Sequence, residues 1–265
     1  MKSIIKTTLL ASVIALSLGA CSSTTISGIS GNNRSQLMLV SSDEVNKKAG
    51  MAYADVIHEA KAHGILNTNK KQAQRVTKIA NKLIAKAPYF RADCKSWDWE
   101  VNVITSKELN AWCMPGGKIA VYTGIIDTLK LTDDEIAVVL GHEITHALRE
   151  HSREQMSQHL IKSSALGIAS LFVDQRLIVA SNALADLGLM LPFSRAHEIE
   201  ADEIGLELVH KAGYNVDAGP SVWQKMAKLN TAGKPLEILS THPSDESRIE
   251  NLERLAKAIK SSKSE

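Results

Sequence analysis

The chain has 265 residues, of which 44% are apolar and 23% are charged, and its formal net charge is +2. This composition supports a packed globular core of one large domain or two small ones. No basic block is interleaved with aromatic residues, so the composition argues against a nucleic-acid partner. Aromatic residues make up only 4% of the chain, so Ala, Leu and Ile must fill most of the core, which favours helices.

Residues 1–20 have the pattern of a bacterial lipoprotein signal peptide. Two lysines precede a short apolar run at 7–18, which is typical of a secretory signal and shorter than the roughly 20 apolar residues of a spanning helix. The run ends in Leu18-Gly19-Ala20-Cys21, which resembles a lipobox and predicts lipidation of Cys21. An ordinary cleaved signal is the alternative. The Ser22 that follows implies, by resemblance to Gram-negative lipoproteins, the periplasmic side of the outer membrane.

The mature chain is expected to begin with a tether and continue as one domain. Residues 21–35 start with the lipidated cysteine and are rich in Ser, Thr, Gly and Asn, which predicts a flexible tether. Residues 36–260 form the folded domain. Export allows disulfides to persist, so Cys94 and Cys113 either form a bridge or remain two buried thiols; the sequence leaves both alternatives open.

The sequence predicts two helices, then two strands, and a helical remainder from Thr132 onward. The expected helices and strands, in chain order, are a helix opened by a capping box at Ser41–Glu44 and ended by Gly64, a helix from about Thr68 to Ala87 before Pro88, a strand with alternating Trp97, Trp99, Val101 and Val103, a turn at Pro115–Gly117, and a strand over 119–124.

The apolar stretch 165–193 has two interpretations. Asp174, Arg176 and Asp186 interrupt it, and a charged residue at a bilayer centre costs on the order of 3 kcal/mol. A membrane-spanning helix is therefore not expected here. The stretch is interpreted as a buried helical hairpin, or as a lid or membrane-facing cover over the site.

His142-Glu143-Ile144-Thr145-His146 is an HExxH motif. Residues four apart share one face of a helix, so both imidazoles can reach one Zn²⁺ ion. Glu143 lies about 100° around the helix and is the candidate general base. The preceding Thr132-Asp133-Asp134-Glu135 is a capping box with extra negative charge at the positive end of the helix dipole, so a well-formed active-site helix is expected.

A catalytic zinc requires a third protein ligand. His151 is five residues beyond His146, about 140° around the helix, and is expected to point away. The segment 194–202 offers better candidates. Spacing alone leaves Glu198, His197 and Glu200 open as the third ligand. Asp202 lies one helical turn after Glu198, where it can support a ligand histidine through the free ring nitrogen.

The chain resembles one family of gluzincin metalloproteases, that of the CaaX prenyl protease, HtpX and the periplasmic proteases BepA, LoiP and YcaL. The shared motifs are the HExxH helix, Leu191–Arg195, Glu198-x-x-x-Asp202 and Thr241–Ser244, and the similarity runs from about Gln36 to Leu255. The soluble, lipoprotein-like branch fits best. The resemblance implies an α+β, zincin-like fold, mostly helical with a small mixed sheet, so that 36–260 would be a zinc metallopeptidase domain holding one Zn²⁺ per chain.

The resemblance also implies roles for residues outside the HExxH helix. It makes Glu198 the third zinc ligand and Asp202 its supporting neighbour. It places Asn110, Ala111 and Trp112 on an edge strand where an extended substrate would add as a further strand. His242 would lie near the metal, either stabilising the oxyanion or occupying the open zinc position in a latent state. Arg248 is a weaker candidate that would anchor this loop or stabilise charge.

The expected function is hydrolysis of internal peptide bonds in unfolded or misassembled cell-envelope proteins. The expected partners are these substrates, the membrane through the N-terminal lipid, and the outer-membrane assembly machinery. The main alternative is an envelope chaperone or assembly factor with little proteolysis. A zinc-stabilised scaffold and a hydrolase of another envelope polymer are further alternatives.

Overall fold

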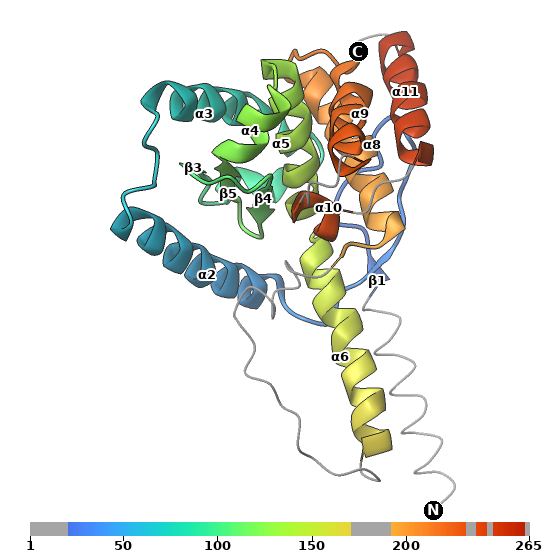
Figure 1. Ribbon diagram of the computed structural model, residues 1–265. Helices are drawn as coiled ribbons and strands as arrows, with labels where there is room; N and C mark the ends of the chain where they lie inside the picture. Colours follow the sequence, from blue (N-terminus) through green and yellow to red (C-terminus); the bar gives the residue numbers. More distant parts are fainter. Residues whose placement is uncertain (1–20, 171–191, 232–236, 243–245, 263–265) are drawn as a thin grey trace, which may run out of the picture.

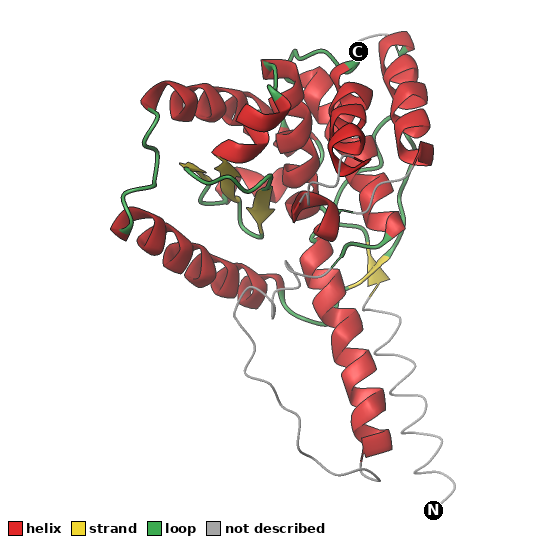
Figure 2. Ribbon diagram, in the orientation of Figure 1, coloured by secondary structure: helices red, strands yellow, loops and turns green. Residues whose placement is uncertain are grey.

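The computed structural model describes residues 21–170, 192–231, 237–242 and 246–262, and shows a mostly helical molecule around a small sheet (Figures 1 and 2). The signal segment expected at 1–20 and positions 171–191 of the expected hairpin lie outside the described residues. The described helices are α2 (Ser42–Ala62), α3 (Lys70–Ile84), α4 (Thr123–Leu129), α5 (Asp133–Leu148), α6 (His151–Ser170), α8 (Arg195–Lys211), α9 (Ala218–Thr231), α10 (Glu237–Thr241) and α11 (Glu246–Ser261), with short 3-10 helices at Ala87–Tyr89 and Ala92–Ser96.

The central sheet is mixed and has three strands. β3 (Glu100–Ile104) runs parallel to β5 (Lys118–Tyr122), and β4 (Ala111–Met114) pairs antiparallel with the other side of β5. The sheet order β3-β5-β4 therefore leaves β4 at an edge. This arrangement confirms the α+β, zincin-like fold class.

Several predicted boundaries shift by a few residues. Trp97 and Trp99 precede β3 and stack on each other, and the Trp99 indole N–H donates to the Cys94 carbonyl. The strand expected over 119–124 ends at Tyr122, and α4 begins directly after it. The N-terminal helices agree better, since Ser41 caps α2 through the Glu44 N–H and Gly64 follows its end with φ +66°.

Helix α5 is the centre of the molecule. Thr132 and Glu135 form the predicted capping box at its N-terminus, and its residues from Glu135 to Leu148 are buried. The helix packs against β4 on one side and against α8 and α9 on the other, while α2 lies across the sheet from it (Figure 1). A helix buried on every side has little freedom to move, which suits it to hold reactive side chains.

The close crossing of α5 and α8 depends on two glycines. A Cβ added at Gly205 would lie 2.9 Å from the Gly141 carbonyl oxygen and 3.0 Å from the His142 nitrogen. A Cβ added at Gly141 would in turn lie 2.9 Å from the Gly205 carbonyl oxygen. Both contacts are to backbone atoms, which cannot rotate away, so the two helices approach this closely only with glycine at both positions.

Residues 23–37, called the N-terminal strap below, lie on the folded domain rather than extending as the flexible tether expected for 21–35. β1 (Cys21–Ser22) pairs with β2 (Gln36–Leu37), and Gln36 is completely buried. Arg34 contacts Glu154 of α6 and Glu200 of α8, each at 2.6 Å. Composition indicated a polar linker, but these polar side chains pair with buried groups of the helices. Lipidation of Cys21 stays a prediction.

Cys94 and Cys113 are separate buried thiols. Burial raises the pKa of the Cys94 thiol to about 11 and that of Cys113 well above its usual value. Of the two alternatives for this pair, the structure shows the unbridged one. No helix in the described part of the chain is both long and apolar enough to cross a membrane.

We expect Gly205→Ala to destabilise the protein by about 1–3 kcal/mol, because overpacking against backbone forces α8 away from α5. Thermal unfolding measures this as a fall of several degrees in Tm. Gly50→Ala in α2 is the matched control, since a Cβ there meets nothing within 4 Å and alanine favours the helix by about 1 kcal/mol. Equal Tm changes for the two variants would contradict the close-contact argument.

We expect Arg34→Met to lower the free energy of unfolding at pH 7 by about 2 kcal/mol. Breaking a fully buried ion pair costs more than this, but Arg34 is partly exposed. The exposed Lys48–Glu44 pair supplies the control, Lys48→Met, which should change Tm little.

The effect of Arg34→Met should shrink as pH falls from 7 to 3. Burial alone would raise the pKa of Glu200, but hydrogen bonds from His151 and Arg34 lower it to about 2, and Arg34 likewise holds the pKa of Glu154 below its usual range. A carboxylate whose pKa is lower in the folded than in the unfolded state contributes fully to stability above pH about 4.5, the unfolded-state value. That contribution is lost as pH falls toward the folded-state pKa. A difference in Tm between wild type and Arg34→Met that stays constant from pH 7 to pH 3 would contradict the assignment of these ion pairs.

Candidate metal centre

Four buried side chains from three parts of the chain converge beside α5. His142 and His146 come from α5, Glu198 comes from α8, and His242 directly follows α10; one nitrogen or oxygen atom of each lies within 4.8 Å of those of the others. This set is called the donor cluster below. The two α5 histidines present their Nε2 atoms 3.1 Å apart, as the HExxH spacing predicts.

Glu198 is the only one of the three predicted third-ligand candidates that reaches the donor cluster. Its Oε2 lies 3.5 Å from His142 Nε2 and its Oε1 lies 3.5 Å from His146 Nε2. His197 instead contacts Glu154, and Glu200 contacts Arg149 and His151. The tertiary contacts thus separate three candidates that spacing alone had left open.

The chemistry of the donor cluster fits a small divalent metal ion. Two imidazole nitrogens and a carboxylate oxygen are the donor types that zinc accepts. Their separations of 3.1 Å and 3.5 Å are near the roughly 3.4 Å between corners of a tetrahedron whose bonds to zinc are about 2.1 Å long.

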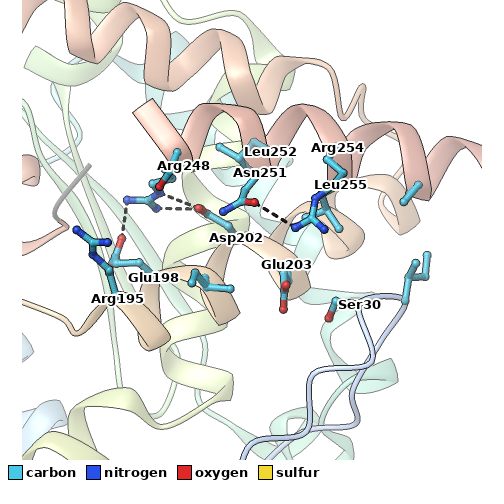
Figure 3. A pocket seen from close by; sticks show the side chains of 14 residues that line it. Ser30, Arg195, Glu198, Asp202, Glu203, Arg248, Asn251, Leu252, Arg254 and Leu255 are labelled. Carbon is cyan, nitrogen blue, oxygen red and sulfur yellow. Dashed lines mark hydrogen bonds and ion pairs between the residues drawn. The ribbon is translucent and has the colours of Figure 1, made fainter. Parts of the chain in front are cut away.

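Asp202 and Arg248 hold two members of the donor cluster in place. Asp202 Oδ1 lies 3.0 Å from His142 Nδ1, so the histidine can donate there and keep Nε2 for the cluster. Arg248 binds Asp202 at 2.7 Å and Glu198 at 2.6 Å, as Figure 3 shows, and its guanidinium lies 3.5 Å from the centre of the Trp223 ring. Burial would raise the pKa of Asp202, but Arg248 and His142 hold it below its usual value. Arg248 therefore partly neutralises two adjacent buried carboxylates.

Glu143 lies beside the donor cluster without belonging to it. Its Oε1 has no hydrogen-bond partner among the described residues and lies 3.5 Å from His242 Nε2. Burial raises the pKa of this carboxyl above its usual value, and nearby His242 and His142 partly offset that rise. A buried carboxylate with a free oxygen and a raised pKa is suited to accept a proton.

His242 lies within the donor cluster rather than at its margin. Its Nδ1 is 3.2 Å from His142 Nε2 and 3.0 Å from Glu198 Oε1. Its main-chain N–H donates to Ile238 in α10. The His242 imidazole therefore occupies the position of a fourth donor.

His151 lies outside the donor cluster, as expected for a residue that is not a metal ligand, but the helical-wheel reason for that expectation is wrong. Its Nδ1 lies 2.8 Å from His146 Nδ1, and its side chain is fully buried. The expectation assumed that α5 continues, but α5 ends at Leu148, Glu150 has φ +50°, and α6 begins at His151 in a new direction. A helical-wheel angle has no meaning across such a break.

Phe193 is a further neighbour of the donor cluster to which sequence reasoning gave no role. Its ring stacks on His146 with centroids 4.0 Å apart, and its main-chain N–H donates to the Thr241 carbonyl. Phe193 thus connects the segment that precedes α8 with Thr241, the residue before His242. The only available signal was its place in the 191–195 motif.

The predicted substrate-binding residues lie at the edge of the sheet. Ala111 and Trp112 begin β4, which packs on α5, and Asn110 precedes it. The Ala111 N–H donates to the Asn110 side chain, and the Trp112 ring makes an edge contact with Tyr53. α10 is tied to this edge, because Ile238 donates to the Leu109 carbonyl.

Comparison of the sequence with known proteins identifies the family of this chain. The sequence model of peptidase family M48 matches residues 70–256. This chain belongs to peptidase family M48. The match spans α3 to α11 and so includes every member of the donor cluster, which agrees with a metallopeptidase, and the gluzincin resemblance drawn from the motifs is confirmed.

Relatives of this M48 peptidase include mitochondrial and bacterial proteases. The mitochondrial metalloendopeptidase OMA1 of Arabidopsis thaliana is 39% identical over 170 residues, which cover 64% of this chain and 34% of the relative. The beta-barrel assembly-enhancing protease of Yersinia pestis is 26% identical over 71% of this chain and 39% of its own. Metalloprotease LoiP of Escherichia coli is 27% identical over 94% of this chain and 95% of its own. The chain spans less than two thirds of the length of the OMA1 relatives.

We expect Glu198→Ala to lose metal and His242→Ala to keep it, because two imidazoles and one carboxylate already provide three protein donors. Metal analysis of purified, dialysed protein should give near-zero stoichiometry for Glu198→Ala and about one metal per chain for His242→Ala. Glu203→Ala, five residues further along α8 and outside the donor cluster, is the control. Full metal content in Glu198→Ala would remove Glu198 from the ligand set.

Proposed function

We propose that this M48 peptidase is a zinc-dependent endopeptidase with His142, His146 and Glu198 as the zinc ligands. The observation that carries the proposal is the convergence of these three donors beside a buried carboxylate, Glu143, whose Oε1 accepts no hydrogen bond from the described residues. These three side chains would hold a zinc ion, which would supply a Lewis acid to polarise a peptide carbonyl and to lower the pKa of a water molecule.

Glu143 is the general base in this proposal. It accepts a proton from the attacking water and passes it to the nitrogen of the departing amine. Its raised pKa brings the carboxylate nearer to the value that favours transfer at neutral pH. The burial of α5 fixes the distance between Glu143 and the two histidines, so the base needs no rearrangement to reach the water.

The outer edge of β4, which pairs with no other strand in the described part of the chain, is the proposed substrate-binding strand. Trp112 is paired directly opposite Ala120 of β5, and the bond from the Tyr122 N–H to the Asn110 carbonyl places Trp112 among the residues bonded to β5. Antiparallel strands alternate the direction of their backbone groups, so those of Ala111 and Cys113 face outward. An extended peptide can pair with these groups as an added strand, with the Asn110 amide side chain giving up its contact to the Ala111 N–H.

His242 is the proposed control element of the site. Its place among the donors fits the latent alternative better than oxyanion stabilisation, because a fourth donor there blocks the position that water needs. Release of His242 would require α10 to shift. Since α10 is bonded to Leu109 just before the edge strand, a substrate that adds to β4 could promote that release.

The proposed substrates are unfolded or misassembled proteins of the cell envelope. The signal-like residues 1–20 and the lipobox at Cys21 support export and anchoring at the periplasmic side of the outer membrane. One relative is named as a beta-barrel assembly-enhancing protease, which supports a partnership with the outer-membrane assembly machinery. A strand-adding site selects extended chains, and such chains are exposed when envelope proteins misfold.

We expect Glu143→Gln to reduce casein cleavage at least 100-fold, a typical contribution of a general base, while its metal content stays at the wild-type level. Cleavage is followed by release of fluorescent peptides at pH 7. Glu108→Gln, which changes an exposed carboxylate near the sheet edge, is the control and should cleave normally. An active Glu143→Gln protein would refute the proposed role. A wild-type protein that suppresses aggregation of an unfolded protein but never cuts it would support the chaperone alternative.

A further inference from the structure

The second ring nitrogen of His146 leads to a chain of buried contacts outside the donor cluster. Its Nε2 faces His142, while its Nδ1 lies 2.8 Å from Nδ1 of His151. The other nitrogen of His151, Nε2, lies 3.0 Å from Glu200 Oε2. Neither His151 nor Glu200 is more than 1% exposed.

Hydrogen bonding allows only one consistent placement of the protons along this chain when His146 binds a metal through Nε2. A ligand nitrogen carries no proton, so neutral His146 keeps its proton on Nδ1. That N–H donates to His151 Nδ1, which must therefore accept. The remaining proton of His151 sits on Nε2 and donates to the Glu200 carboxylate.

We propose that His151 and Glu200 are positioning residues that fix the ring orientation and tautomer of His146 through a His146–His151–Glu200 relay. The proposal rests on the metal site described under the proposed function. It assigns a task to a residue whose sequence position alone would exclude it.

The two α5 histidines are supported differently. The Nδ1 of His142 donates directly to the carboxylate of Asp202, whereas the Nδ1 of His146 reaches the carboxylate of Glu200 only through the imidazole of His151. A carboxylate that is hydrogen-bonded directly to a ligand histidine raises the basicity of that histidine. An imidazole placed between the two reduces the effect of the carboxylate's negative charge on the ligand. The carboxylates that contact the donor cluster directly, Glu198 and Asp202, are the two that Arg248 neutralises.

The surroundings of His151 hold it in this position. Its ring stacks on His197 with centroids 4.4 Å apart and an interplanar angle of 18°. Glu200 is held as an anion by Arg149 at 2.9 Å and by Arg34 of the N-terminal strap. The strap therefore contacts the group that terminates the relay, which gives a physical reason for its close packing on the domain.

The test compares zinc affinity in three variants, measured by competition with a chromophoric chelator. We expect His151→Phe, which keeps the ring shape and removes both nitrogens, to weaken zinc binding about 10- to 100-fold, as is usual for loss of such an outer partner. His151→Gln offers one acceptor and one donor and should bind zinc within about threefold of wild type. The matched control is His197→Phe, since His197 is equally buried, stacks on His151 and contacts Glu154 instead of the donor cluster.

A spectroscopic measurement on the unmodified protein gives an independent reading. In zinc-loaded protein labelled with ¹⁵N-histidine, the relay requires a protonated His146 Nδ1 with a scalar coupling across the hydrogen bond to His151 Nδ1. An unprotonated His146 Nδ1 would overturn the relay, even if His151→Phe failed to fold.

The outcomes separate the relay from the metal site itself. Wild-type protein that binds no zinc overturns both. Zinc binding by His151→Phe equal to wild type, or an equal loss in His197→Phe, overturns the relay and leaves the zinc site standing. Weak binding in His151→Phe with recovery in His151→Gln supports the relay, because a packing defect would not be repaired by an amide.

Discussion

The contact between the backbones of α5 and α8 at Gly141 and Gly205 is the constraint on which the site depends. The donor cluster needs groups from both helices within a few ångströms, and side chains as short as those of histidine and glutamate can meet only if the helix axes lie close. Gly141 directly precedes His142, so the point of closest approach is also the point where the first donor projects. Any side chain at these two positions would separate α5 from Glu198 and Asp202.

Charge balance around this crossing explains the polar groups buried behind it. Arg248 pairs with Glu198 and Asp202 on one side of the donor cluster, and Arg149 and Arg34 pair with Glu200 on the other. Buried carboxylates without such partners would be protonated or would expand the fold. These pairs bring α11 and the N-terminal strap into the same structural unit as the catalytic helices, although both lie far from them in the sequence.

The segments around His242 connect the donor cluster to the edge strand β4. α10 is bonded to Leu109 next to the edge strand, and Thr241 accepts from Phe193, which stacks on His146. A displacement of α10 would therefore move its contacts with the segment before the edge strand, with Phe193 and with His242 at the same time. This arrangement gives the proposed latent state a mechanical connection to the strand where substrate would add.

The sequence by itself determined what depends on local geometry. The capping box at Thr132, the shared face of His142 and His146, and the spacing of Glu198 and Asp202 follow from the period of a helix, and they predicted most of the donor cluster. Contacts between segments were decided only by the tertiary structure. It placed Glu198, which helical spacing had left open and the family resemblance had implied, in the donor cluster in preference to His197 and Glu200. It also packed the N-terminal strap on the domain, and it brought His151 to His146 by ending α5 at Leu148. Helical periodicity cannot reach across a break in the helix, and the pairing of a charged side chain depends on which distant partner is buried beside it.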